Sequence, residues 1–226
     1  MAINADNQVF AEMLILERFA QTCDLVGLKL PNDSIKFREL NLNHPRADKY
    51  YIDPSKWPNE ELIELMALAQ HHRLPTRLLD WSRRSYVAAY FAASFALSKR
   101  NEWKKDDRLA VWALDVHHIH LYKKVSLIKV PGSTSVNLAA QAGVFTLLKQ
   151  EGTRRSPLVT KYLDEEFKTL PNTPLWKFTL PVTHSTRILE LCELYGINAA
   201  SLFPGYDGVV KAVFDHINMW RKLEDK

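Results

Sequence analysis

The chain has 226 residues, a net charge of +4 and a hydrophobic content of 46 %, which is enough for a folded domain with a sizeable core. The basic excess is small and spread among acidic residues, so nucleic-acid binding is not implied. The two cysteines form no CxxC pair, and the first residues lack the features of a signal peptide, so a cytoplasmic location is expected. The longest apolar run, YVAAYFAASFAL, is too short to cross a bilayer, and we expect no membrane association.

Apolar residues at helical spacing predict a first helix over residues 6–22. Residues 30–58 contain four prolines and no clear period, which indicates a long surface excursion. Asn59 is placed to cap a second helix that includes residues 60–73 and is stopped by Pro75. The order of these segments predicts a helical N-terminal part.

Residues 76–80 predict a short extended segment, after which Ser82 is expected to cap a helix over residues 83–99. This helix is apolar on nearly every side, so it is expected to be central and mostly buried. Later apolar runs predict four strands and two further helices, over residues 109–116, 126–130, 144–149 and 175–181 for the strands and over 183–196 and 208–223 for the helices. The pattern is that of an α+β fold with N-terminal helices and small mixed or antiparallel sheets, in one domain over residues 1–226.

Two groups of histidines are candidates for chemistry. His117, His118 and His120 would give a zinc ion three ligands, short of the four that a structural zinc site has. We therefore expect no metal. His71 and His72 end the second predicted helix, where a cation suits the negative end of the helix dipole. The alternative is that one of these two rings points into a cleft and hydrogen-bonds a ligand.

Asp80 lies at the end of a segment expected to be buried, where an ionised carboxylate requires a partner. Arg77 is the expected partner, with the N-terminus of the next helix as the other candidate. A salt bridge here would lock the strand to the helix. The two side chains are also candidates for the wall of a binding site, because strand-to-helix turns commonly face pockets.

Polar tips on otherwise apolar elements mark a second candidate region. Tyr86 and Tyr90 are four residues apart on one helical face, with Ser94 one turn further on; such a stripe either packs in the core or lines a pocket. Gln141 precedes a predicted strand. It either presents its amide beside an open backbone or belongs to a turn in which Gly143 takes a positive φ.

The segment LAQHHRLPTRLLDWSRRSYVAAYFA resembles the signature of the FRG domain family, and NLAAQAGVFT and SLFPGYDGVVKAV resemble two later family segments. The resemblance spans about residues 8–215. Arg73 stands where the family has glycine, and Ser82 where it has threonine. The Phe/Tyr-Arg-Gly strand that precedes the first long helix of the family has no counterpart, so we expect the chain to be N-terminally incomplete relative to the family.

A weaker similarity to ADP-ribosyltransferase-like folds implies NAD, held in a cleft between two small sheets. It implies that Tyr86 or Tyr90 stacks on nicotinamide and that Gln141 is the candidate catalytic residue, near the place of a catalytic glutamate. Glutamine stabilises the developing positive charge only weakly, so slow or absent turnover is expected. The candidate ligand-binding residues are His71, His72, Arg77, Asp80, Tyr86 and Tyr90.

Three hypotheses remain open at the level of the sequence. The chain is a nucleotide-related enzyme, a non-catalytic binding or interaction module with a small-molecule or protein partner, or a piece of a longer enzyme. Fold-level analogy does not choose among them.

Overall fold

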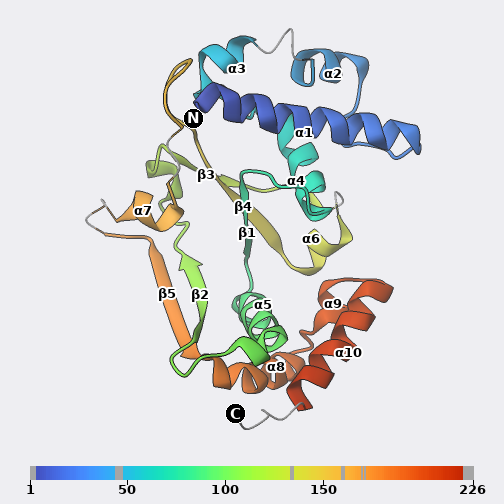
Figure 1. Ribbon diagram of the computed structural model, residues 1–226, viewed down its shortest axis with the longest axis vertical. Coiled ribbons are helices and arrows are strands. Elements are labelled where there is room, and N and C mark those ends of the chain that lie inside the picture. Colours follow the sequence, from blue (N-terminus) through green and yellow to red (C-terminus); the bar gives the residue numbers. More distant parts are fainter. Residues whose placement is uncertain are drawn as a thin grey trace. The chain divides into compact units, whose positions relative to one another are not determined.

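A computed structural model describes residues 4–43, 48–132, 135–158, 161–168, 170 and 172–220. The chain forms two compact units (Figure 1), each built from three segments. The first unit comprises Met1–Asp80, His117–Ser135 and Phe145–Glu166. The second comprises Trp81–Val116, Val136–Val144 and Phe167–Lys226. No helix in the described ranges is long and apolar enough to span a membrane.

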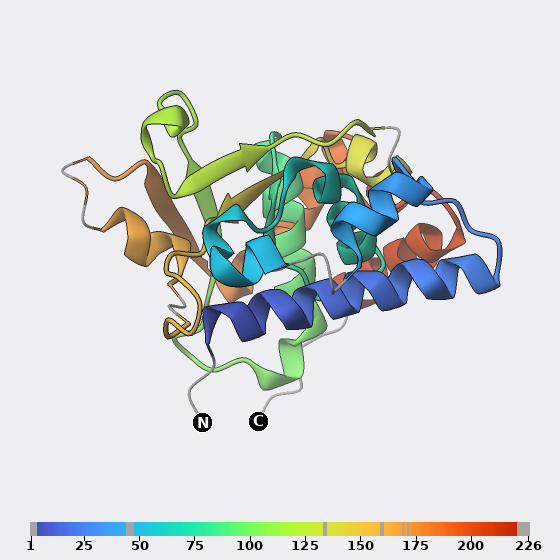
Figure 2. The same ribbon diagram turned by 90° about the horizontal axis from the view of Figure 1, so that it is seen from above.

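The first unit is organised around one long helix, α1, which is 21 residues long (Figure 2). Val9, Met13, Leu16 and Ala20 recur at helical spacing and are almost fully buried. Helices α3 Asp48–Ile52 and α4 Ile63–His71 pack against α1. The helices of the unit are α1 Ala5–Leu25, α2 Ile35–Asn41, α3 Asp48–Ile52 and α4 Ile63–His71, with 3₁₀ turns η2 Pro54–Lys56 and η3 Glu60–Leu62.

The segment expected as a surface excursion contributes to the core instead. Phe37, Tyr50 and Trp57 are all buried, and the Tyr50 and Trp57 rings meet edge to face with centroids 5.3 Å apart. The prediction of an excursion is wrong because α2 and α3 have only seven and five residues. Elements of that length are too short to show a helical period in the sequence.

A buried ion pair connects α1 to the chain that enters the first strand. The Arg77 guanidinium donates from Nε and one terminal nitrogen to both carboxylate oxygens of Glu12, at 2.7 and 2.9 Å. Trp57 donates its indole N–H to Glu12 at 2.8 Å. The two charged side chains are only 12 % and 9 % exposed. Three segments distant in sequence are thus held at one carboxylate.

Helix α4 is closed by a Schellman motif. The Arg73 N–H donates to the Gln70 carbonyl at 2.8 Å, and the Leu74 N–H donates to the Ala69 carbonyl at 3.0 Å. This geometry puts Arg73 in the left-handed region with a φ of 69°, the conformation that glycine adopts without steric cost. The helix therefore ends at His71, before Pro75, and Arg73 occupies a position that favours glycine.

Two small sheets complete the fold. One has the strand order β1-β4-β3, with β1 Leu78–Ser82, β4 Gly143–Leu148 and β3 Val125–Ile128, and β3 runs antiparallel to β4. The other pairs β2 Arg108–Leu114 antiparallel with β5 Leu175–Pro181. All of the strands lie where the sequence predicts them to within a few residues. The α+β class with small antiparallel sheets is confirmed.

The second unit packs its helices around α5 Ser85–Ser98. Its other helices are α6 Val136–Ala140, α8 Ser185–Leu194, α9 Ala199–Leu202 and α10 Tyr206–Trp220. Val87, Leu97, Leu189 and Leu202 are among the buried side chains of their common core. The short helix α7 Leu163–Phe167 precedes β5, and the 3₁₀ turns η4 Arg100–Glu102, η5 Ile119–Leu121 and η7 Val182–His184 lie in connections.

Helix α5 is less buried than its composition predicts. One face packs in the core, but Phe91 is 37 % exposed and Phe95 is 69 % exposed. Because the helix is apolar all round, its sequence does not indicate which side is covered. The expectation of a mostly buried helix is correct for one face only.

The Glu12–Arg77 pair predicts a large effect of substitution. Arg77→Met leaves the Glu12 carboxylate buried without its cation, so we expect a loss of about 3–5 kcal/mol in the free energy of unfolding. The matched control is Arg38→Met, which removes a cation from the partly exposed ion pairs with Asp24 and Asp33 and should cost under about 1 kcal/mol. Urea unfolding measures both; equal losses would contradict a special role for Arg77.

The left-handed backbone at Arg73 predicts a stabilising substitution. Arg73→Gly relieves the steric cost of the positive φ, and we expect a gain of about 0.5–1 kcal/mol after the larger chain entropy of glycine is taken into account. Arg73→Ala separates this backbone effect from loss of the side chain, because alanine keeps the strain. Thermal melts in which both variants shift equally would show that the backbone is not the cause.

Candidate functional site

The candidate residues predicted from the sequence fall in both units. His71, His72, Arg77 and Asp80 belong to the first unit, and Tyr86, Tyr90 and Gln141 belong to the second. Each group is described within its own unit.

In the first unit, Asp80 is held by Gln70 and not by Arg77. The Gln70 side-chain amide donates to the Asp80 carboxylate at 2.6 Å, and the Thr76 hydroxyl donates to the Gln70 carbonyl oxygen. Arg77 is engaged with Glu12. Gln70, Thr76 and Asp80 therefore form a relay that joins the end of α4 to β1, and the expected Arg77–Asp80 salt bridge is wrong.

Asp80 is partly exposed to solvent, but neighbouring protein atoms remove part of the water around its carboxyl group. Desolvation raises its pKa, while the Gln70 hydrogen bond and the nearby His71 partly oppose the rise. Desolvation likewise lowers the pKa of His71, which also faces the His72 ring at a centroid distance of 5.1 Å. The Ser135 hydroxyl lies 3.4 Å from the ring nitrogens of His71. The two histidines are the last residue and the C-cap of α4.

His117, His118 and His120 lie in and just before η5 and not on a strand. Their rings contact one another in sequence order, with centroid distances of 4.4 and 6.3 Å. Across the described part of the chain, no group of three or more histidine, cysteine or acidic residues is arranged to hold a metal ion.

In the second unit, the turn before α5 is fixed by Ser82. Its hydroxyl donates to the Gln141 carbonyl at 2.7 Å and accepts the Arg84 N–H at 3.0 Å. The Arg83 N–H donates to the Ala142 carbonyl at 3.1 Å. Ser82 thus ties the turn to the segment between α6 and β4. It is not the N-cap of α5, which is Arg84 and has no side-chain acceptor.

The Gln141 side chain is also used within the protein. Its amide donates to the Leu202 carbonyl at the end of α9, at 3.1 Å. The positive φ in this turn belongs to Ala142, at 49°, and not to Gly143. Gly143 instead makes room for the Leu138 side chain, which occupies the space that a Cβ atom would need. Gln141 therefore holds two segments of the second unit together.

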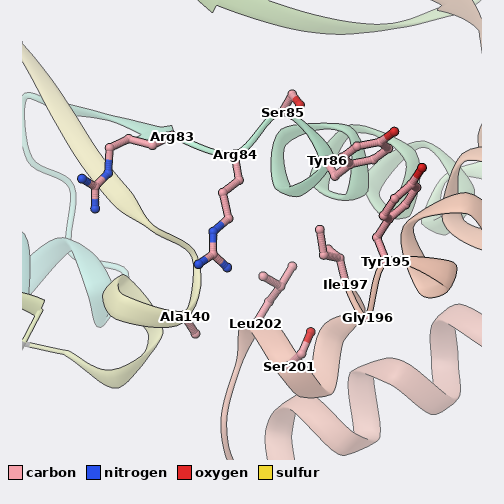
Figure 3. A pocket seen from close by; sticks show the side chains of 10 residues that line it. All are labelled: Arg83, Arg84, Ser85, Tyr86, Ala140, Tyr195, Gly196, Ile197, Ser201 and Leu202. Atoms are coloured by element: carbon pink, nitrogen blue, oxygen red, sulfur yellow. The ribbon is translucent and has the colours of Figure 1, made fainter.

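A cavity of about 520 Å³ lies next to these segments (Figure 3). Its lining comes from the turn before α5, from the first helical turn of α5, from the end of α6, and from the end of α8 through α9. The lining residues are Arg83, Arg84, Ser85, Tyr86, Ala140, Tyr195, Gly196, Ile197, Ser201 and Leu202. The sequence marks Tyr86, Tyr90 and Gln141 as candidates for the wall of a pocket in this region. Of these three, Tyr86 lines the cavity.

The charge of this cavity is one-sided. Its described lining includes two arginines and no carboxylate, and within the described ranges neither guanidinium forms a salt bridge. Arg84 points toward Leu202, whereas Arg83 points away from it (Figure 3). Both cations lie at the positive end of α5, an unfavourable place for them without a nearby anion.

Two tyrosines form the aromatic wall of the cavity. The Tyr86 and Tyr195 rings lie 4.5 Å apart between centroids, tilted by 30°. They are 42 % and 62 % exposed, so ring surface remains open to solvent. The hydrogen bond with Tyr195 raises the pKa of Tyr86.

Tyr90 serves a different purpose from Tyr86. Its hydroxyl donates to Asp215 at 2.5 Å, Ser94 donates to the same carboxylate at 2.8 Å, and Lys211 donates to Ser94 at 2.7 Å. Burial, followed by the hydrogen bond to Asp215, raises the pKa of Tyr90 well above its usual range. Tyr90 and Ser94 are therefore part of a buried polar cluster that joins α5 to α10.

The sequence interpretation did not select Arg83, Arg84 or Tyr195. A signal for the arginines was present, because two adjacent cations at the start of a predicted helix oppose its dipole. No sequence signal pointed to Tyr195, since only the packing of α8 against α5 brings it to Tyr86.

The family model of the FRG domain matches residues 28–118. This range is about two fifths of the chain and includes α4, β1, α5 and the turn that carries Arg83 and Arg84. Over these residues the chain is similar to the FRG domain. No curated protein and no solved structure gives a significant match.

The raised pKa of Asp80 predicts how the stability of the protein depends on pH. A carboxyl whose pKa is higher in the folded than in the unfolded state contributes stability at pH below its unfolded pKa, and this contribution is lost as pH rises through the folded pKa. Asp80→Asn keeps an acceptor for Gln70 and removes the ionisation. We expect the variant to be at least as stable as the unsubstituted protein at pH 7. As the pH falls toward 3, the unsubstituted protein should gain stability relative to the variant.

Gln70→Ala is the companion variant, because it removes the donor and should destabilise by about 1 kcal/mol. Denaturant titrations across this pH range decide the matter. A loss at pH 7 for Asp80→Asn as large as that for Gln70→Ala would mean that the negative charge itself is required.

Proposed function

We propose that the second unit binds a phosphorylated nucleotide-type ligand, of which NAD is one member, in the cavity beside the N-terminus of α5. The observation that carries the proposal is the meeting of two arginines that form no salt bridge among the described residues, a helix N-terminus and an open tyrosine pair around one space whose described lining has no carboxylate. The size of the cavity is in the range of small-molecule sites.

Each part of such a ligand has a matching group. Phosphate suits Arg84 and the N–H groups of Ser85 and Tyr86, for which no acceptor is found among the described residues. A planar base or nicotinamide ring suits the exposed surfaces of Tyr86 and Tyr195. Ser85 and Ser201 line the same cavity. The Ser201 hydroxyl already donates to the Asn198 carbonyl, so the Ser85 hydroxyl is the candidate donor to ribose.

Binding without group transfer is the form of this function that the cavity favours. Cleavage of a glycosidic bond to nicotinamide develops positive charge that a carboxylate stabilises, and the described lining supplies none. Gln141 donates to Leu202, so we propose a positioning role for it: it holds α9, which carries Ser201, against the cavity.

Isothermal titration calorimetry with a ligand series tests the proposal. ADP-ribose, NAD and AMP carry both a ring and phosphate, adenosine lacks phosphate, and inorganic pyrophosphate lacks a ring. We expect the first three to bind, adenosine to bind at least about tenfold more weakly, a difference of 1.4 kcal/mol, and pyrophosphate to bind weakly in competition with them.

Substitutions in the cavity lining test whether the nucleotide binds there. Arg84→Ala and Tyr86→Ala should each weaken AMP binding by about tenfold or more, from loss of a charge-assisted contact and of ring stacking respectively. Arg187→Ala is the control, since it removes an equal charge from an exposed position of α8, outside the lining. Absence of binding by every nucleotide, or an equal effect of Arg187→Ala, would refute the proposal.

A further inference from the structure

Helix α10 presents its apolar side to solvent and its small and polar side to the protein. Gly208 and Asp215 are its two buried residues. The Phe203 carbonyl occupies the space that a Cβ atom at Gly208 would need, and Asp215 accepts hydrogen bonds from Tyr90 and Ser94. These contacts fix the rotation of the helix about its axis, so its apolar side cannot turn inward.

The open side carries seven large apolar side chains, each from 49 to 91 % exposed: Tyr206, Val209, Val210, Val213, Phe214, Ile217 and Trp220. Such a surface exceeds the scattered apolar residues that are normal on a monomer. We call these seven residues the α10 stripe.

The spacing of the stripe is that of a helix–helix seam. Tyr206, Val210, Val213, Ile217 and Trp220 are separated alternately by four and three residues, the a/d pattern of a coiled coil. In the same heptad frame, the buried Gly208 and Asp215 both fall on f, the position opposite the seam. The partner that fits this face is therefore a second helix with a matching stripe.

The ends of the stripe are matched in side-chain size about its centre. Val213 lies at the centre, with a large aromatic residue one heptad away on either side, Tyr206 and Trp220. Antiparallel pairing of two copies about Val213 places Tyr206 opposite Trp220, Val209 opposite Ile217, and valine opposite valine at the dyad, while Val210 faces the ring of His216 at the edge of the seam. This self-complementarity is what an isologous twofold interface requires.

The polar residues beside the stripe disfavour a lipid surface. Asp207, Lys211, His216 and Asn218 lie between or next to the apolar positions, and His216 is 2.9 Å from Glu193 of its own chain. A membrane-bound amphipathic helix carries a Lys- and Arg-rich polar side, which the described part of α10 lacks. Antiparallel pairing also aligns the two helix dipoles favourably.

We infer that the α10 stripe is the interface of a homodimer, in which two copies of α10 pack antiparallel across a twofold axis near Val213. The three aromatic residues alone offer on the order of 400 Å² of open surface, and the aliphatic members bring the stripe into the range of the roughly 800 Å² per partner of a stable interface.

Analytical ultracentrifugation of the full chain tests the dimer. We expect reversible dimerisation in the micromolar range, and at least about a tenfold increase in the dimer dissociation constant for Val213→Glu, which places two like charges together at the dyad. Leu25→Glu is the matched control: Leu25 is 85 % exposed at the end of α1, and the variant should dimerise like the unsubstituted chain. Circular dichroism melts check that both variants remain folded.

The orientation has its own test. Val213→Cys should form an intermolecular disulfide under mild oxidation, because the native cysteines, Cys23 and Cys192, are buried and the two introduced thiols meet at the dyad. Leu25→Cys should form none at the same concentration. A chain that stays monomeric at about 100 µM, or a dimer that survives Val213→Glu unchanged, overturns the inference.

Discussion

The Glu12 carboxylate is the point on which the arrangement of the first unit depends. It is buried, and it accepts from the Arg77 guanidinium and the Trp57 indole. An ionised group without water is tolerated only when it is paired and hydrogen-bonded, so α1, the segment after α3 and the entry to β1 must meet there. With Arg77 fixed at the start of β1 and Ser82 bonded at its end, the strand is anchored at both ends.

This explains how the motif QHHRLPTRLLDWS is used. Gln70, Thr76 and Asp80 bond to one another, Arg77 bonds to Glu12, and Ser82 bonds to Gln141 and Arg84. Most of its polar side chains therefore hold the scaffold. The groups that remain open for binding follow directly after it, at the start of α5, where a rigid turn presents two arginines beside the helix N-terminus.

The second unit combines an open cationic cavity with an open apolar helix, and one buried residue links α5 to α10. Asp215 collects the hydroxyls of Tyr90 and Ser94, which orients α5 and α10 against each other. The same contacts that turn the apolar side of α10 outward thus also fix the body of the helix whose first turn lines the cavity. The scaffold and these two exposed surfaces are set by a few buried polar groups, since apolar packing alone does not fix the rotation of helices that are apolar on several sides.

The sequence by itself determined α1, α4, α5, α8 and α10 and all of the strands to within a few residues, because periods of 3.6 and 2 survive in elements long enough to show them. It also marked Tyr86 as a candidate for a pocket wall, with packing in the core as the alternative. Only the tertiary structure decided that the segment around Tyr50 is core, since helices of five to seven residues show no period. It alone decided which partner each charged or polar group takes: Gln70 rather than Arg77 for Asp80, and Asp215 for Tyr90. Hydrogen-bond partners are chosen among residues distant in the chain, by proximity that no local pattern records.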